Sequence, residues 1–175
     1  FFNCDKLLKI SILPTITSID NYGFDRCSSL NEIILPPSIT FIGERTFKGC
    51  SSLKKIKIPS QVSSIGNESF SNCQSLKEVI FEEPSSLTEI KDYLFCDCSS
   101  LEQIKIPSSI IQIGCNVFKG CQSLKDISIP SSVISISDLC FENCIALEQI
   151  SYFPSLNCIG NINFFNCNCL TQISI

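Results

Sequence analysis

Hydrophobic residues return at the same places in successive segments of the chain, each about 23 residues long. Counted from Cys50, apolar residues stand three, six, eight, twelve, fifteen and twenty places later, and the segment from Cys98 repeats this spacing. The matched pairs are Leu53 and Leu101, Ile56 and Ile104, Ile58 and Ile106, Val62 and Ile110, Ile65 and Ile113, and Phe70 and Phe118. Self-similarity of this kind is typical of units that bury their apolar faces only by stacking on one another. The pattern therefore predicts a solenoid of stacked rungs.

Each unit is expected to contain two short extended pieces. The apolar residues six and eight places after the cysteine flank one variable residue, which is the alternation of a half-buried strand. Proline follows directly, as at Pro59 and Pro107, and ends the strand because it has no amide donor. A Ser-rich stretch then leads to a second extended piece, as in residues 62–65. The rest of the unit is long enough for only one helical or 3₁₀ turn.

Glycine follows the second extended piece in four units, at Gly43, Gly66, Gly114 and Gly160. A turn that needs positive φ is the usual reason for glycine at such a place. The sequence therefore predicts positive φ at these four positions.

A Phe-x-x-Cys motif marks the period. It occurs as Phe1/Cys4, Phe24/Cys27, Phe47/Cys50, Phe70/Cys73, Phe95/Cys98, Phe118/Cys121, Phe141/Cys144 and Phe164/Cys167. Successive cysteines are 23 residues apart except from Cys73 to Cys98, where the interval is 25 and the insertion carries Glu82 and Glu83. The chain thus counts as one domain over residues 1–175, with about seven full repeats and partial repeats at both ends, and we expect it to be a segment of a longer protein.

Composition and charge exclude several partners. The chain is 44% hydrophobic but has no apolar run of the roughly 20 residues that cross a membrane, so no membrane insertion by this segment is expected. The net charge is −4, and no dense cluster of Lys and Arg is present. Because nucleic-acid binding requires such a cluster, no nucleic-acid partner is expected.

The thirteen cysteines invite a chemical interpretation. Eight of them form the column of the motif, where thiols in neighbouring rungs are expected to stack in parallel as small buried groups rather than as disulfides. The other five, Cys96, Cys115, Cys140, Cys158 and Cys169, form no second column. The two Cys-x-Cys pairs lack a second pair or histidines, and the chain has no histidine, so no metal, no cofactor and no Ser-His or Cys-His catalysis is expected.

Outward positions of the first strand hold the candidate contact residues. The residue five places after each cysteine alternates in charge along Lys9, Glu32, Lys55 and Glu78, and opposite charges on neighbouring strands would fix register. Two places further on, Ile34 and Ile80 flank Lys57 as a possible contact patch. Glu82 and Glu83 form either a solvated bulge or a local recognition feature. The full candidate surface is Glu32, Ile34, Lys55, Lys57, Glu78, Ile80, Glu82, Glu83, Gln103 and Lys105.

Three aromatic residues occupy columns that are polar in other rungs. They are Tyr22, Phe41 and Tyr93, and we expect their rings to be exposed. Exposed aromatic rings are candidates for interface anchors.

The unit from Cys50 to Phe70 resembles the repeat of BspA-like leucine-rich-repeat proteins, and the resemblance spans the whole chain. It implies a right-handed solenoid of the α/β class, dominated by β structure, with a parallel sheet on one face and 3₁₀, irregular or short extended segments on the other. It departs from the family pattern where Thr46, Ser69, Leu94 and Val117 replace the usual alanine before the phenylalanine. Members of the family are implied to be surface-exposed or secreted proteins that bind host or matrix proteins and other cells.

The expected function is therefore non-catalytic binding of a protein or glycan ligand, such as a host or extracellular-matrix protein, by an adhesin-like module that is secreted or on the cell surface. The alternative is a cytoplasmic scaffold for protein–protein interaction, which free thiols would favour. The sequon at Asn67 is a possible glycosylation site. An enzyme would need turnover that is lost when Glu78, Asp126 or Glu82 is neutralised.

Overall fold

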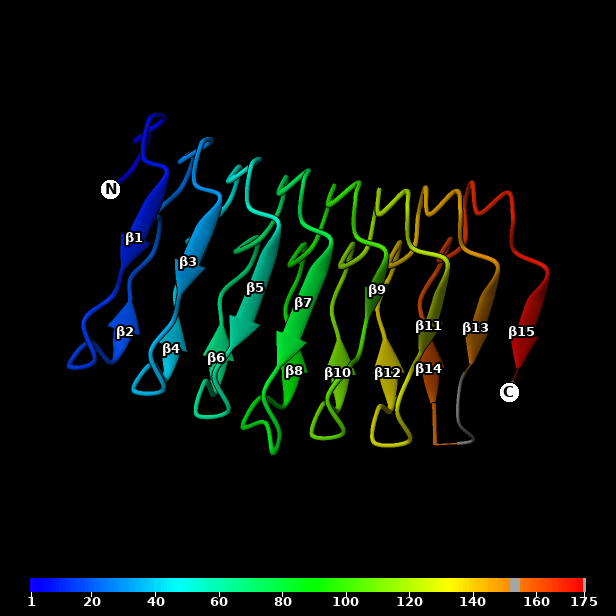
Figure 1. Ribbon diagram of the computed structural model, residues 1–175. Helices are drawn as coiled ribbons and strands as arrows, with labels where there is room; N and C mark the ends of the chain where they lie inside the picture. Colours follow the sequence, from blue (N-terminus) through cyan, green and yellow to red (C-terminus); the bar gives the residue numbers. More distant parts are fainter. Residues whose placement is uncertain (152–154, 175) are drawn as a thin grey trace.

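The structure is a computed structural model that describes residues 1–151 and 155–174. Its described part contains short parallel strands joined by turns, and no helix. Figure 1 shows the rungs stacked in chain order from the N-terminus to the C-terminus, with two rows of strands running along the stack. The predicted solenoid with a parallel sheet on one face is confirmed, and of the alternatives predicted for the rest of the rung the described residues show short extended segments and turns.

The first row of strands, here called the first sheet, contains the predicted half-buried strand of each rung. Its members are β1 (Lys9–Ser11), β3 (Glu32–Ile34), β5 (Lys55–Ile58), β7 (Glu78–Phe81), β9 (Gln103–Ile104), β11 (Asp126–Ser128), β13 (Gln149–Ser151) and β15 (Gln172–Ser174). Equivalent residues pair within the groups β1–β3, β5–β7–β9 and β11–β13–β15, so that Lys55 lies opposite Glu78 and Ile56 opposite Val79. The burial pattern of β5 alternates between exposed and buried residues, as one solvent face and one core face require.

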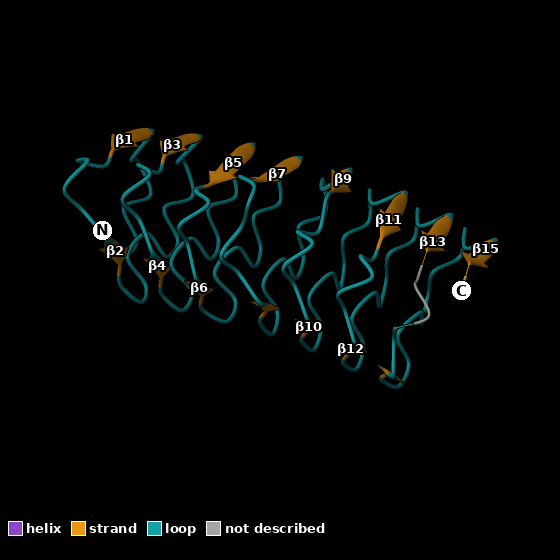
Figure 2. Ribbon diagram, turned by 90° about the horizontal axis from the view of Figure 1, so that it is seen from below, coloured by secondary structure: helices purple, strands orange, loops and turns teal. Residues whose placement is uncertain are grey.

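The second row, here called the second sheet, contains the predicted second extended piece. Its members are β2 (Ser18–Ile19), β4 (Phe41–Ile42), β6 (Ser64–Ile65), β8 (Glu89–Ile90), β10 (Gln112–Ile113), β12 (Ser135–Ile136) and β14 (Cys158–Ile159). Seen from below in Figure 2, the two sheets form separate sides of the solenoid. One isoleucine per strand points into the core from Ile19 to Ile136.

The Phe-x-x-Cys segments form turns on the remaining side. Their backbone amides donate to carbonyls of the next rung, as from Tyr22 to Glu44, from Phe24 to Thr46 and from Arg26 to Lys48, at 2.7–2.8 Å. Most of these turns contain two residues with positive φ, such as Glu68 (57°) and Asn72 (60°). The turn side therefore carries a main-chain ladder although it contains no strand.

Side chains stack in columns through the core. Phenylalanine rings of successive rungs lie nearly parallel, with centroids 5.3 Å apart for Phe47 and Phe70 and 5.9 Å apart for Phe95 and Phe118. From Cys27 to Cys167, each cysteine of the column donates its Sγ–H to the carbonyl oxygen of the phenylalanine one rung earlier, as from Cys98 to Phe70 at 3.1 Å. The predicted column is confirmed, and the thiol adds a hydrogen bond to its apolar contacts.

The glycines after the second extended piece have a different role from the one predicted. Among the described residues, positive φ occurs in glycine only at Gly49 and Gly120, so the prediction for Gly43, Gly66, Gly114 and Gly160 is wrong. Their need for glycine is steric. A Cβ on Gly66 would collide with the backbone of Glu44 in the preceding rung, and only a residue without a side chain permits this close approach.

Candidate functional site

The outward face of the first sheet presents two rows of side chains. The first row contains Lys9, Glu32, Lys55, Glu78, Gln103, Asp126, Gln149 and Gln172, and the second row contains Ser11, Ile34, Lys57, Ile80, Lys105, Ser128 and Ser151. Buried residues of the same strands alternate with them, as Ile33 does between Glu32 and Ile34. All ten candidate contact residues lie on this face or in the loop that follows β7.

Ion pairs neutralise the N-terminal half of this face. Lys9 pairs with Glu32 at 2.8 Å and Lys55 with Glu78 at 2.7 Å, as the charge alternation predicted. Lys57 reaches across to Glu82 in the insertion at 2.5 Å. The hydrogen bond from Lys57 holds the pKa of Glu82 below its ordinary value. Because exposed pairs of this kind contribute at most about 1 kcal/mol, they chiefly set register and leave little net charge for a ligand.

The proposed apolar patch is only partly present. Ile34 is 62% exposed, whereas Ile80 is half-buried beside the hollow described next. The expected exposure of both isoleucines is therefore correct only for Ile34. The three aromatic residues are exposed as predicted, at 39% for Tyr22 and Phe41 and 41% for Tyr93, but Tyr22 and Tyr93 lie in the turns, away from the first sheet.

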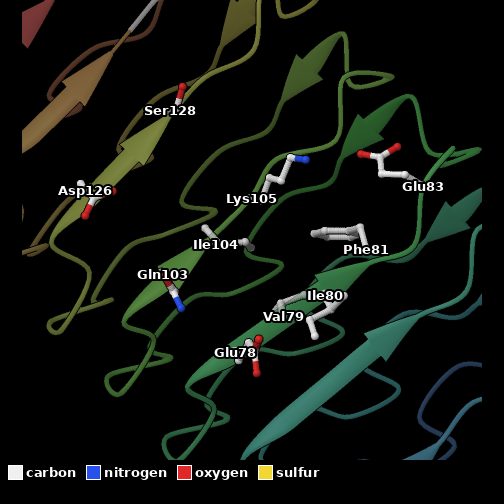
Figure 3. Close-up of a pocket in the computed structure, with 10 residues that line it drawn as sticks. All are labelled: Glu78, Val79, Ile80, Phe81, Glu83, Gln103, Ile104, Lys105, Asp126 and Ser128. Atoms are coloured by element: carbon white, nitrogen blue, oxygen red, sulfur yellow. The ribbon is translucent and has the colours of Figure 1, made fainter.

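The first sheet is interrupted between β3 and β5 and again beside the insertion. β7 pairs with β5 over four residues, but its ladder with β9 ends at Val79 and Ile104. In the described residues no ladder joins β9 to β11. A hollow of about 390 Å³ opens at this point. It is lined by Glu78, Val79, Ile80, Phe81, Glu83, Gln103, Ile104, Lys105, Asp126 and Ser128 (Figure 3).

A second hollow of about 760 Å³ continues the first towards the loops. The two share Glu83, Lys105 and Ser128, and the second adds Pro84, Ile106, Ser108, Pro130 and Ser131. We call the two hollows together the β9 groove. Residues 103–108 form its floor, residues 78–84 one wall and residues 126–131 the other.

The groove brings together half of the predicted surface. Glu78, Ile80, Glu83, Gln103 and Lys105 line it, while Glu32, Ile34, Lys55, Lys57 and Glu82 lie outside it. The candidate set omitted Phe81, which fills a core column, and Asp126 and Ser128, whose rung is regular. Only the position of the insertion one rung earlier could have indicated them.

Charges in the groove are less completely paired than on the rest of the face. Within the described residues Glu83, Lys105 and Asp126 form no ion pair, whereas Glu78 is held by Lys55. The Oε2 atom of Glu83 accepts a hydrogen bond from the backbone amide of Ser85 at 3.0 Å. This bond is local to the insertion loop. The groove therefore offers two carboxylates and one ammonium group to a ligand.

A second charged cluster lies on the turn side, and the sequence analysis did not single it out. Glu68 accepts from Arg45 at 2.6 Å and also from Lys48. Burial raises the pKa of Glu68, but the hydrogen bonds from Lys48 and Arg45 outweigh it, and the net pKa lies below the ordinary value. Nearby, burial raises the pKa of Asp25, whose Oδ1 has no hydrogen-bond partner in the described structure.

Asn67, the possible glycosylation site, is exposed just after β6, and its main-chain oxygen accepts from the Arg45 amide at 2.9 Å. The hydroxyl of the sequon serine is not accessible. Ser69 is fully buried, and its Oγ lies within hydrogen-bond distance of two carbonyl oxygens, those of Gly43 and Gly66, at 2.6 and 2.7 Å.

The cysteines are free thiols, of which only Cys158 and Cys169 are exposed. Within the described residues no group of three or more Cys, Asp or Glu side chains is arranged to hold a metal ion. In the same residues there is no helix with the length and hydropathy that crossing a bilayer requires.

Solved structures share this architecture. A leucine-rich repeat protein from Bacteroides ovatus is 32% identical, with a TM-score of 0.71 over 99% of this chain and 50% of its own. The T. pallidum leucine-rich repeat protein is 28% identical, with a TM-score of 0.88 over 94% of this chain and 78% of its own. A leucine-rich repeat protein from Eubacterium ventriosum is also 28% identical, with a TM-score of 0.86 over 95% of this chain and 44% of its own.

The chain thus spans about half of the Bacteroides protein and less than half of the Eubacterium protein. No curated protein matches it. The family model for the BspA type leucine-rich repeat region matches residues 1–95 and 81–175 in six copies, which together span every rung. The chain therefore belongs to the BspA type leucine-rich repeat family.

Proposed function

We propose that this chain is a non-catalytic recognition module that binds a protein or glycan partner on the outward face of the first sheet. The observation that supports this most directly is the β9 groove, where the sheet is interrupted and unpaired charges adjoin apolar side chains. Binding sites are usually concave, with an apolar lining and a few polar groups that orient the ligand. Elsewhere on the face, paired charges leave less for a partner to recognise.

We further propose that the module acts on the cell surface or in secreted form, on host or extracellular-matrix proteins. The family resemblance supports this placement. The thirteen free thiols support the second candidate, an intracellular scaffold, because reduced cysteine is the normal state in the cytosol. Thiol mapping and glycan analysis of Asn67 on protein from its native host separate the two: an occupied Asn67 or extensive disulfides would exclude the scaffold.

The proposed binding face is tested by filling the groove. Ser128 and Ser151 are paired neighbours on β11 and β13, and both are exposed, but only Ser128 lines the groove. A bulky side chain at Ser128→Trp should obstruct any ligand in the groove, whereas Ser151→Trp is a matched control. The immobilised chain and both variants are incubated with extracellular and cytosolic protein pools and with a glycan array.

We expect a partner that the unaltered chain and Ser151→Trp retain and that Ser128→Trp loses. Equal retention by all three proteins would show that the ligand does not occupy the β9 groove. The absence of any specific partner in every pool and on the array would count against a recognition function.

A further inference from the structure

The interruption of the first sheet leaves main-chain groups without strand partners. In the regular part of the sheet, Lys57 and Ile58 of β5 pair with Ile80 and Phe81 of β7. One rung further, the corresponding residues Lys105 and Ile106 belong to no strand ladder in the described structure. Ile80 and Phe81 are therefore paired on the β5 side only, and β11 is paired on the β13 side only.

The dimensions of the β9 groove suit an extended chain. Its floor runs over residues 103–108, parallel to the strands, and at about 3.3 Å per residue this is a length of roughly 16 Å. Its walls belong to β7 and β11, two rungs apart, and are therefore separated by about twice the strand spacing of roughly 4.8 Å. A groove of this shape accommodates about five residues of extended polypeptide.

The charge in the groove favours a basic ligand. Glu83 extends from one wall and Asp126 from the other, and neither forms an ion pair in the described structure, while Lys105 is the one unpaired ammonium group between them (Figure 3). The fourth charged group, Glu78, is already paired with Lys55. The unpaired groups thus carry a net negative charge, and a Lys or Arg side chain of the ligand could reach a carboxylate on either wall.

We propose that the β9 groove binds an extended, basic peptide segment of a partner protein. This inference rests on the proposed recognition function and names its ligand class. Main-chain groups of the segment would bond to those that the interrupted ladder leaves free, which is the way in which proteins capture peptides at an open sheet edge. Its basic side chains would pair with Glu83 and Asp126, and its apolar side chains would lie on Phe81 and Ile80.

The test uses selection from a display library of short random-sequence peptides on the intact chain. The selected sequences should be enriched in Lys and Arg. Replacing both groove carboxylates, as Glu83→Gln with Asp126→Asn, should weaken binding of a selected peptide by at least about tenfold, which is the effect expected for losing one good charged contact. Lys105→Gln should strengthen it, because it removes the one repulsive charge.

Two controls separate groove binding from general attraction. Glu148→Gln removes an exposed carboxylate that forms no ion pair in the described structure and lies outside the groove, and it should leave affinity unchanged. A copy of the selected peptide with alternate backbone nitrogens methylated keeps every side chain but loses main-chain donors, and it should bind at least about tenfold more weakly.

Enrichment of acidic or uncharged peptides, or equal loss with Glu148→Gln, would overturn the proposal. So would a failure to select any peptide. If Ser128→Trp nonetheless abolishes binding of the native partner or of a glycan, only the ligand class is wrong and the recognition function stands. If no binding depends on the groove, both the peptide ligand class and the proposed recognition function are wrong.

Discussion

Single residues with positive φ bend the backbone in each turn. Several of the left-handed positions hold residues suited to them, such as Asn116, Gly120 and Asn143. Ile162, with a φ of 55° and a side chain that is 63% exposed, is the one β-branched residue among the described residues with positive φ. A β-branched residue in this region clashes with its own backbone, and little burial compensates for the strain here.

Replacing Ile162 with the asparagine that another rung uses at this position should therefore stabilise the protein. We expect Ile162→Asn to raise the free energy of unfolding by about 1 kcal/mol, measured by urea denaturation. Ile134→Asn is the control, because Ile134 is 42% exposed and is not among the residues with positive φ. A gain of the same size there would show that removing surface hydrophobicity, rather than relieving strain, is responsible.

Two carboxylates on the turn side should respond to pH in opposite directions. Burial raises the pKa of Asp25 in the folded state, so the charged form destabilises the fold, and this cost appears as pH rises through the folded pKa. Asp25→Asn should accordingly raise the melting temperature at pH 7. Below the ordinary pKa of about 3.9 the carboxyl is protonated in both states and the advantage should disappear.

The folded pKa of Glu68 is lowered instead. Its contribution is present above the unfolded pKa of about 4.3 and is lost as pH falls through the folded value. Glu68→Gln should lower the melting temperature at pH 7, with a deficit that shrinks in acid. Melting curves of both variants from pH 7 to pH 3 provide the comparison, and parallel shifts at every pH would contradict the assignment of either group.

At the scale of the element, much of the rung could be predicted because the core requires the same residue at the same place in every copy. Leu53, Ile56 and Phe70 recur because each stacks on its equivalents, and their spacing alone located both strands. The role of Gly66 was misjudged, because a sequence pattern does not distinguish a residue that needs positive φ from one that needs close approach to Glu44 in another rung.

The β9 groove could be predicted only in part, for a related reason. Glu83 was predicted because it lies in the insertion, and Lys105 because it occupies an outward position of its rung. That Phe81, Asp126 and Ser128 line the same hollow could not be predicted, since the hollow depends on where pairing between β7 and β9 stops. The residue at which this pairing ends depends on both rungs, so the pattern within one rung does not reveal it.

Considered as a whole, the molecule is a one-dimensional stack whose rungs contact only their neighbours, so local opening should be easiest where burial is lowest. Column cysteines report on this directly. Cys73, Cys98 and Cys121 are fully buried, whereas Cys4 and Cys167 are only partly so. Burial also raises the pKa of the central thiols far above the ordinary value, which suppresses the reactive thiolate.

Alkylation of the folded protein at neutral pH should therefore proceed in a definite order. Cys158 and Cys169, which are exposed, should react first, Cys4 and Cys167 next, and the central column last. Mass spectrometry of peptides from timed samples measures the order, and urea should abolish it. Rapid labelling of Cys98 in the folded protein would show that the stack opens as a whole.

The insertion after β7 leaves the stack of rings continuous. Phe70 and Phe95 remain parallel within 13° at 5.7 Å although two additional residues separate their rungs. The loop at residues 82–86 is consequently a place where foreign sequence could be grafted, since tolerance to insertion depends on how little buried structure the change disturbs. Under the proposed function, a change of loop length in this one rung would alter the binding surface while the stacked core stays the same.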